Sequence, residues 1–229
     1  MIVGVIPARL ESTRFPRKIL FPIRNRPMVM HVFERALKAK KLDRLIIAVD
    51  SLETVDALRD YDAEVLMTSS KHQSGTDRIA EAVKKVNTDI VVNIQGDEPM
   101  IEPQLIDDLI AVFDDKTVKI ATLASTIITE DDMNSLNAVK VKIDKNNNAC
   151  GFYRQISDEK HSFLRHIGIY GYRKETLMKF TALPQSENEM KYNLEQLRAM
   201  DNEIPIHVVT CEYPYRGIDT QEDLKQLKL

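Results

Sequence analysis

The first 125 residues alternate short apolar runs with amphipathic stretches, and this alternation constrains the fold more than any other feature. Short apolar runs bounded by turn residues predict strands buried on both faces, and the stretches between them have helical periodicity. Strands and helices in strict alternation predict a parallel sheet covered by helices on both faces. The expected strands are residues 2–7, 44–49, 64–67, 90–94 and 120–124, and the expected helices are residues 27–40, 51–60, 76–86 and 103–113.

The pattern changes after about residue 125. Residues 138–143 and 149–154 flank a turn-rich segment that contains Asn146, Asn147 and Asn148, which predicts an antiparallel hairpin. Further strands are expected at 166–172 and 205–210, and further helices at 174–180, 190–200 and 220–227. We therefore predict a single α/β domain, residues 1–229, with a doubly wound, mostly parallel sheet and a hairpin embellishment. A nucleotide-binding half would reach about residue 125, and an acceptor-binding half would span about 126–229.

Charge and cysteine content narrow the possible functions. The net charge of -3 argues against a nucleic-acid binder that relies on a basic surface. Cys150 and Cys211 lack the spacing of a metal site and are expected to be reduced thiols. The apolar start of the chain is too short to span a membrane and lacks the features of a signal peptide. The expectation is a cytoplasmic protein bound to neither membrane nor nucleic acid.

The loop after the first expected strand carries the cations Arg9, Arg14 and Lys18, together with the hydroxyls of Ser12 and Thr13. Such a loop can surround a triphosphate with charge-assisted hydrogen bonds and main-chain N–H groups. It lacks the glycines of the common phosphate-binding motifs, so a solvated basic loop is the alternative. Its place directly after the first strand favours phosphate binding.

Two aspartates are candidate metal ligands. Asp97 follows the strand at 90–94 within Gln95-Gly96-Asp97-Glu98-Pro99, where Gly96 permits close approach of the backbone. Asp219 lies in Gly217-Ile218-Asp219-Thr220. Mg²⁺ typically takes one or two protein carboxylates and completes its octahedron with phosphates and water. A polar turn at Asp97 and a helix N-cap at Asp219 are the alternatives.

Three other segments carry polar residues whose roles stay open at this point. Residues 72–78 place small polar groups at an expected helix start, where they would bind a base or ribose or merely cap the helix. His166 and Tyr170 lie in a strand, where a histidine is most often structural. Glu195 and Arg198 have the spacing of a simple helix ion pair.

Taken together, these segments resemble the CMP-Kdo synthetases, which are 3-deoxy-manno-octulosonate cytidylyltransferases. The resemblance covers nearly the whole chain, and its most specific strings are HQSGT, NIQGDEPMI and RHIGIYGY. Further matching strings are IPAR with STRFPRK, RPM, NAVKV, LEQLR and GIDTQEDL. The related sialic-acid cytidylyltransferases usually have a glycine-rich first loop, which this chain lacks.

The resemblance implies a fold of the nucleotide-diphosphosugar transferase type, a homodimer, and an enzyme of lipopolysaccharide synthesis. The enzyme would join CTP to a Kdo-type sugar acid and release pyrophosphate. It implies nucleotide binding by Pro7, Ala8, Arg9, Arg14, Lys18, Ser74, Gly75 and Gln95. It implies magnesium at Asp97 and Asp219, which with Arg14 and Lys18 form the catalytic set. It implies contact with the sugar acid by Arg154, His166, Tyr170, Glu195 and Gln196.

Four departures from the family pattern leave the choice of sugar open. Arg17 stands where the family usually has glycine, and Asn25-Arg26 replaces a usual Gly-Lys pair. Residues 155–161 form a short acidic segment in place of a longer insertion, and Tyr192 replaces a common glutamate. If Asp158 and Glu159 border the C8 end of the sugar, they suit an ammonium there, so 8-amino-8-deoxy-Kdo is one alternative substrate. A sialic-type acid is another, and a non-catalytic nucleotide-binding protein is the alternative from a different class.

Overall fold

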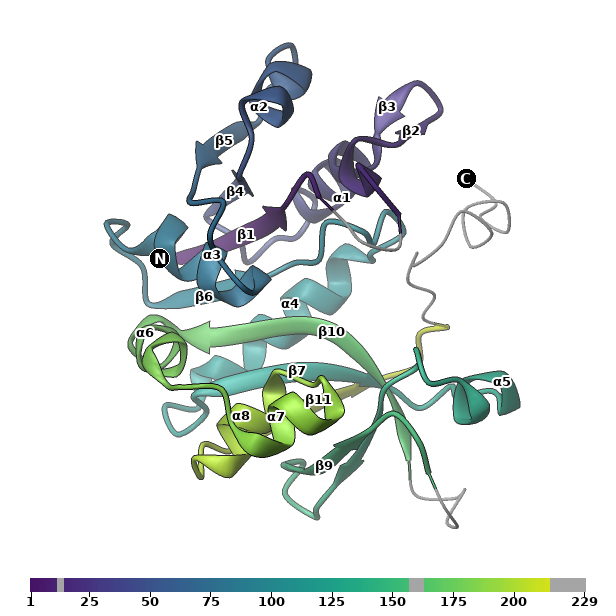
Figure 1. The fold of residues 1–229 in the computed structure, drawn as a ribbon. Helices are drawn as coiled ribbons and strands as arrows, with labels where there is room; N and C mark the ends of the chain where they lie inside the picture. The colour runs from purple at the N-terminus through teal and green to yellow at the C-terminus, as the bar shows by residue number, and fades with distance from the viewer. Residues whose placement is uncertain (12–14, 157–162, 215–229) are drawn as a thin grey trace. The chain divides into compact units, whose positions relative to one another are not determined.

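A computed structural model describes residues 1–11, 15–156 and 163–214 of the protein (Figure 1). These residues divide into two compact units, one from Met1 to Asp107 and one from Asp108 onward. The boundary between these units lies before the expected strand at 120–124. The division expected near residue 125 separated a nucleotide-binding half from an acceptor-binding half, and it stays a prediction. Within the described ranges, no helix is both long enough and apolar enough to cross a membrane.

The first unit is built on four parallel strands. β1 (Ile2–Ala8) pairs with β4 (Arg44–Val49) on one side and with β6 (Ile90–Asn93) on the other. β5 (Glu64–Met67) pairs with the outer edge of β4. The strand positions predicted from the apolar runs are confirmed to within one residue. Because all four strands are parallel, their carboxyl ends lie at one edge of the sheet, where ligands bind in open α/β sheets.

Helices alternate with these strands as predicted (Figure 1). They are α1 (Met28–Ala36), α2 (Leu52–Leu58), α3 (Gly75–Val83) and α4 (Pro103–Ala111), and α1 and α3 both pack against β1. Ser51 and Ser74 cap α2 and α3, since each side chain accepts a hydrogen bond from a main-chain N–H of the first turn. A short hairpin of β2 (Pro22–Ile23) and β3 (Arg26–Pro27), preceded by the 3₁₀ turn η1 (Lys18–Leu20), was not predicted.

The second unit has a mixed sheet. β7 (Ile120–Ser125) pairs in parallel with β11 (Ile206–Cys211) and antiparallel with β10 (Leu164–Arg173). The predicted hairpin is confirmed as β8 (Lys140–Ile143) and β9 (Ala149–Tyr153), and β8 also pairs with β10. With the first unit, this makes an α/β fold with a mostly parallel sheet and an antiparallel hairpin, as the sequence predicted.

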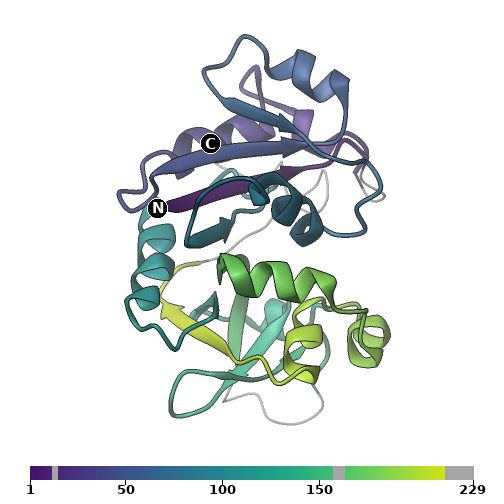
Figure 2. The same ribbon diagram turned by 90° about the vertical axis from the view of Figure 1, so that its left-hand side faces the viewer.

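The helices of the second unit differ in part from the prediction. They are α5 (Glu130–Asn134), α6 (Lys174–Ala182), α7 (Glu187–Tyr192) and α8 (Gln196–Asp201), with the turn η2 (Val112–Asp114) after α4. The single helix expected at 190–200 is wrong, because Asn193 adopts a left-handed conformation (φ 51°) that ends α7. Both views show α7 and α8 on the same side of β7 and β11 (Figures 1 and 2). The helix expected at 220–227 lies outside the described residues.

Candidate nucleotide site and candidate sugar pocket

In the first unit, three predicted nucleotide-binding segments meet at Pro7, near the carboxyl end of β1. A methyl group added at Gly75, the first residue of α3, would come within 3.3 Å of the Pro7 side chain. One added at Gly96, in the loop after β6, would come within 3.2 Å of the Pro7 carbonyl oxygen. A side chain at either position would be tight, so glycine eases this close approach of the backbone. The fold therefore brings Pro7, Ser74-Gly75 and Gln95-Gly96 together, as strand ends in a parallel sheet predict.

Lys18 and Asp97 add charge to this edge of the sheet. The Nζ atom of Lys18 lies 2.5 Å from Oδ2 of Asp97, and the two side chains are 10% and 33% exposed. Burying a lysine ammonium group is costly unless an opposite charge lies beside it, and the Asp97 carboxylate provides that charge. The pair links the start of η1 to the loop after β6. Lys18 and Asp97, which were predicted to bind phosphate and metal, are thus neighbours. Arg9 is exposed.

Backbone conformation explains why the family usually has glycine at two positions where this chain has Arg17 and Asn25. Arg17 has φ 59° and ψ 26°, and Asn25 has φ 63°, both in the left-handed region that glycine occupies without strain. Arg24 (φ 46°) and Asn25 form the two-residue turn between β2 and β3, where two positive φ values suit the twist of a hairpin. Asparagine tolerates this conformation better than most residues, whereas arginine does not. The exposed Arg17 side chain forms an ion pair with Glu53 of α2.

We expect Arg17→Gly to be more stable than Arg17→Ala by about 1 kcal/mol, because both lose the ion pair and only alanine keeps the strain of a left-handed residue. Urea unfolding of the two variants measures this difference. Arg59 is the matched control, since it is also an exposed arginine in an ion pair but has φ -60° at the end of α2. There the order should reverse, with alanine more stable than glycine. Equal stability of the two Arg17 variants would contradict the argument.

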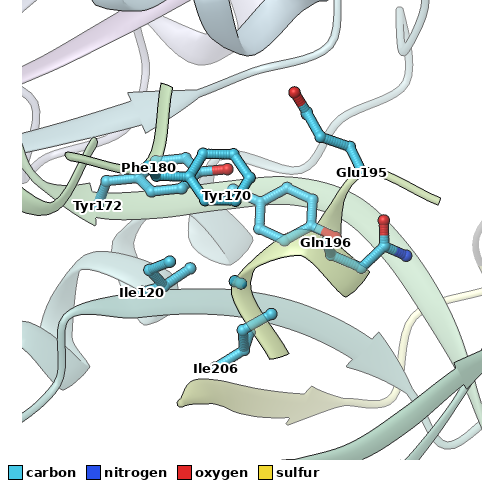
Figure 3. A pocket seen from close by; sticks show the side chains of 8 residues that line it. Ile120, Tyr170, Tyr172, Phe180, Glu195, Gln196 and Ile206 are labelled. Atoms are coloured by element: carbon cyan, nitrogen blue, oxygen red, sulfur yellow. The ribbon is translucent and has the colours of Figure 1, made fainter. Parts of the chain in front are cut away.

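The second unit contains a pocket on one face of its sheet. Its cavity is small, about 20 Å³, and opens to solvent, and three predicted sugar-binding residues line it: Tyr170, Glu195 and Gln196. Figure 3 shows aromatic and aliphatic side chains on one side of the pocket and the carboxylate and amide on the other. The remaining lining residues are Ile120, Tyr172, Phe180, Ala199 and Ile206. An apolar floor with a few convergent polar groups is typical of a small-molecule site.

Tyr170 supplies a buried polar atom to this pocket. Its hydroxyl oxygen is buried and makes no hydrogen bond of good geometry within the described residues, although the Thr122 side chain is near enough to oppose part of its pKa shift. Burial raises the pKa of the Tyr170 phenol well above its ordinary value of 10.0, and the Glu195 carboxylate adds to the effect. The hydroxyl is therefore a neutral donor at physiological pH. A buried unsatisfied donor is costly in free energy, so its presence in a pocket points to a ligand or water partner.

A bulge in β10 sets the position of Tyr170. The register of the pairing between β10 and β7 shifts between Ile167 and Tyr170. The hydroxyl of Thr122 has one proton, which it can donate to the carbonyl of Ile169 (2.8 Å) or of Ile167 (3.2 Å), and its oxygen lies 3.0 Å from Nε2 of His166. Bulges commonly re-aim side chains beside binding sites.

His166, the fourth predicted sugar-binding residue, is buried and contacts the ring of Tyr170. Its ring packs against Phe152 and Tyr170, with centroids 5.1 Å and 5.5 Å apart. Burial, with a smaller contribution from the charge of Arg165, lowers the pKa of His166 to about 3. The imidazole is therefore uncharged at neutral pH and cannot pair with a carboxylate as a cation.

Arg154, the fifth predicted sugar-binding residue, braces the main chain beside the pocket. Its guanidinium donates to the carbonyls of Leu136 (3.0 Å), Tyr192 (3.2 Å) and Asn193 (3.0 Å). Its own carbonyl accepts from Nζ of Lys140 at 2.6 Å, and this fully buried lysine also bonds the carbonyls of Ser135 and Ala138. These contacts fix the segment just before Glu195, so Arg154 and Lys140 hold one wall of the pocket in place.

Arg198 lies next to two residues that line the pocket, Phe180 and Glu195. It pairs with Glu189 through two hydrogen bonds of 2.7 Å and 2.5 Å, and both side chains are 6% exposed. Its guanidinium also lies 4.9 Å from the ring centroid of Phe180 and 3.8 Å from Oε1 of Glu195. The predicted helix pair of Glu195 and Arg198 is thus the weaker of two contacts, and the buried partner, Glu189, was not predicted.

Several predicted residues lie outside the described ranges. Arg14, with Ser12 and Thr13, belongs to residues 12–14, Asp219 to residues 215–229, and Asp158 with Glu159 to residues 157–162. Their assigned roles stay predictions. Asp50, which bonds the main chain of the expected phosphate loop, was not predicted at all.

Comparison with known proteins defines the class of this chain. The sequence profile of the family described as Cytidylyltransferase matches residues 3–207. The chain therefore belongs to the cytidylyltransferase family.

Similar proteins place the chain in one branch of the cytidylyltransferase family. The chain is 44% identical to a 3-deoxy-manno-octulosonate cytidylyltransferase of Thermodesulfovibrio yellowstonii, over 97% of this chain and 95% of the relative. It is 41% identical to 3-deoxy-manno-octulosonate cytidylyltransferase 2 of Actinobacillus pleuropneumoniae, over 98% and 96% of the two chains. The solved structure of CMP:2-keto-3-deoxy-manno-octonic acid synthetase complexed with CTP superposes with a TM-score of 0.92 at 36% identity, covering 98% of this chain and 95% of that one. Within its family the chain belongs with the CMP-Kdo synthetases, as the resemblance implied.

The fold extends beyond this branch. A glucose-1-phosphate thymidylyltransferase from Bacillus anthracis superposes with a TM-score of 0.71 at 16% identity, over 99% of this chain and 93% of that one. At this identity the likeness concerns the fold alone, and it supports the predicted nucleotide-diphosphosugar transferase type.

Proposed function

We propose that this protein transfers the cytidylyl group of CTP to a Kdo-type sugar acid and releases pyrophosphate. The observation that carries the proposal is identity of 44% over nearly the full length of a 3-deoxy-manno-octulosonate cytidylyltransferase. In this reaction the anomeric hydroxyl oxygen attacks the α-phosphorus of CTP. A new P–O bond forms, the bond to the β-phosphate breaks, pyrophosphate leaves with the bonding electrons, and the hydroxyl loses its proton. The CMP-sugar would serve lipopolysaccharide synthesis, and the reaction would take place in the cytoplasm.

On the nucleotide side, the residues that meet at Pro7 would bind CTP. Lys18 would donate to a phosphate, with the exposed Arg9 and with Arg14 of the undescribed segment 12–14. The half-buried Ser74, Gly75 and the half-buried Gln95 would lie around the cytidine. Ser74 already accepts a hydrogen bond from the N–H of Asp77 as a helix cap, and its hydroxyl proton is still able to donate to a ligand. Fixed donors of this kind stabilise the charge that develops during phosphoryl transfer.

Magnesium is the metal that this site fits. The Asp97 carboxylate is one-third exposed at the sheet edge and already neutralises a cationic side chain, Lys18. Anionic oxygen is the ligand that Mg²⁺ prefers, and one or two carboxylates suffice when phosphates complete the coordination. Asp97 would hold the ion with Asp219, which lies beyond the described residues. When bound, the ion would neutralise phosphate charge and lower the pKa of the sugar hydroxyl.

On the sugar side, the pocket of the second unit would receive the sugar acid. The Tyr170 hydroxyl, the Glu195 carboxylate and the Gln196 amide would bind sugar hydroxyls, since all three line the pocket. His166 is uncharged and buried, so its part would be to hold Tyr170 through the ring contact. Arg154 would bind the sugar carboxylate beside, or in place of, the three main-chain contacts of its guanidinium. The homodimer implied by the resemblance remains part of this proposal.

Pyrophosphate release tests this function. With Mg²⁺ present, we expect release from CTP to depend on Kdo and to stop when EDTA removes the metal. The same assay with 8-amino-8-deoxy-Kdo and a sialic acid distinguishes the alternative substrates. A Kdo preference of about tenfold, the difference that one good charged contact makes, would exclude the amino sugar as the better substrate. Absence of release with every sugar acid, despite CTP binding, would favour the non-catalytic alternative.

A further inference from the structure

We propose that Asp50 is a positioning residue for the loop that begins at Arg9, and that it sets the affinity for the triphosphate of CTP. This inference rests on the proposed function, because the loop is taken to bind phosphates. Asp50 directly follows β4 and is not part of any segment that carries the family resemblance. No contact of Asp50 with a substrate is proposed, since it acts through the main chain of the loop.

Both oxygens of the Asp50 carboxylate have defined partners. Oδ1 accepts a hydrogen bond from the main-chain N–H of Leu10 at 2.9 Å, and Oδ2 accepts one from Nη2 of Arg78 at 2.9 Å. Leu10 follows Arg9, so the carboxylate fixes the first peptide unit beyond β1. The Asp50 side chain is only 13% exposed, and charge-assisted hydrogen bonds are strong where water is largely excluded.

Arg78 anchors this carboxylate to the nucleotide side of α3. Its side chain is 3% exposed, and its Nη1 atom also donates to Thr68 Oγ1 at 2.7 Å and to the Ser69 carbonyl at 3.2 Å. Arg78 lies one helical turn after Gly75, which packs against Pro7. Helix α3 therefore packs against the end of β1 at Pro7 and holds the loop itself at Leu10, through Asp50. This couples the position of the loop to the segment expected to bind cytidine.

The chain provides a matched control at the other end of the same two strands. Asp43 directly precedes β4, and its Oδ2 atom accepts a hydrogen bond from the N–H of Ile2 at 2.7 Å, at the start of β1. Asp43 and Asp50 thus bracket β4, and each bonds a main-chain amide at one end of β1. Only Asp50 acts at the end where the loop begins. A change at either carboxylate affects one such bond, but only a change at Asp50 should alter the loop.

The test compares Asp50→Asn with Asp43→Asn by calorimetry with CTP and with CMP, at constant Mg²⁺. In Asp50→Asn the amide oxygen can still accept from Leu10, but the amide nitrogen then faces another donor, Arg78, and the anchor is lost. We expect CTP binding to weaken about tenfold, the effect of losing one charge-assisted hydrogen bond. CMP binding should change by less than about twofold, and so should both affinities in Asp43→Asn. A purely structural role would lower the melting temperature without changing the ratio of the CTP and CMP affinities.

Arg78→Lys is the second variant, and it keeps a cation near Asp50 but loses the fork that spans Thr68, Ser69 and Asp50. It should reduce the CTP affinity selectively, in the same direction as Asp50→Asn, and it keeps the test decisive if Asp50→Asn does not fold. The inference is overturned if either folded variant binds CTP as tightly as Asp43→Asn does. Failure of the proposed function looks different, because the wild-type protein would then not bind CTP.

Discussion

Replacing Asp97 by alanine should lower kcat by about a hundredfold or more, the usual effect of removing preorganised charge stabilisation from a transition state. Asp97 directly follows Gly96, which meets Pro7 at the edge of the sheet, and it lies 2.5 Å from Lys18. Its loss would remove a ligand of the expected Mg²⁺ and leave Lys18 without that counter-charge. Turnover measured at saturating CTP and Kdo gives the result directly. Asp219→Ala should have an effect of the same size if Asp219 is the second ligand.

Asp89 provides the control for this variant. It directly precedes β6, whereas Asp97 follows it, and its side chain is 79% exposed in a surface pair with the N-terminal amino group. Asp89→Ala should keep nearly full turnover, because a surface pair of this kind contributes little. Near wild-type turnover of Asp97→Ala would show that Asp97 is not a metal ligand.

Replacing Arg198 by methionine should lower the free energy of unfolding by about 3–5 kcal/mol, because it leaves the buried Glu189 carboxylate without its partner. Burial by itself raises the pKa of Glu189, but the hydrogen bonds and charge of Arg198 outweigh it, so the net pKa lies below 4.5. The contribution of this ion pair is therefore fully present at neutral pH. It is lost as the pH falls below 4.5 and through the pKa of the folded state.

The double variant Glu189→Leu, Arg198→Met is the control for this effect. It removes both charges, and buried ion pairs can often be replaced by apolar residues at little cost. Urea unfolding at pH 7 should show most of the lost stability restored in the double variant. A loss below about 1 kcal/mol in Arg198→Met would place this pair among weak surface contacts and contradict its burial.

The fold was predictable from the sequence wherever apolar runs were unambiguous. The strands β1, β4 and β6 were found because each is a buried run with a helical stretch after it. The helix expected at 190–200 failed because periodicity carries no sign of the left-handed Asn193 that separates α7 from α8. The bulge before Tyr170 was also not predictable, because it depends on hydrogen bonds from Thr122, far away in the sequence.

The candidate site was predictable to a different extent on its two sides. Residues at strand ends, such as Gln95 and Asp97, follow from the rule that ligands bind at the carboxyl edge of a parallel sheet. Asp50 and Lys140 were missed because they act on main-chain groups of other segments, which leave no pattern in the sequence. The sugar-binding residues came from the family resemblance alone, and the structure adds that three of them line one pocket.

The central claim is that the cytidylyl group reaches the sugar acid, and the products of a single mixture test it most directly. Protein, CTP, Kdo and Mg²⁺ are mixed and quenched, and pyrophosphate and the CMP-sugar are both counted by mass spectrometry. The proposed reaction predicts one CMP-sugar for each pyrophosphate at early times. Pyrophosphate formed with free CMP and no CMP-sugar would identify a hydrolase instead and contradict the account.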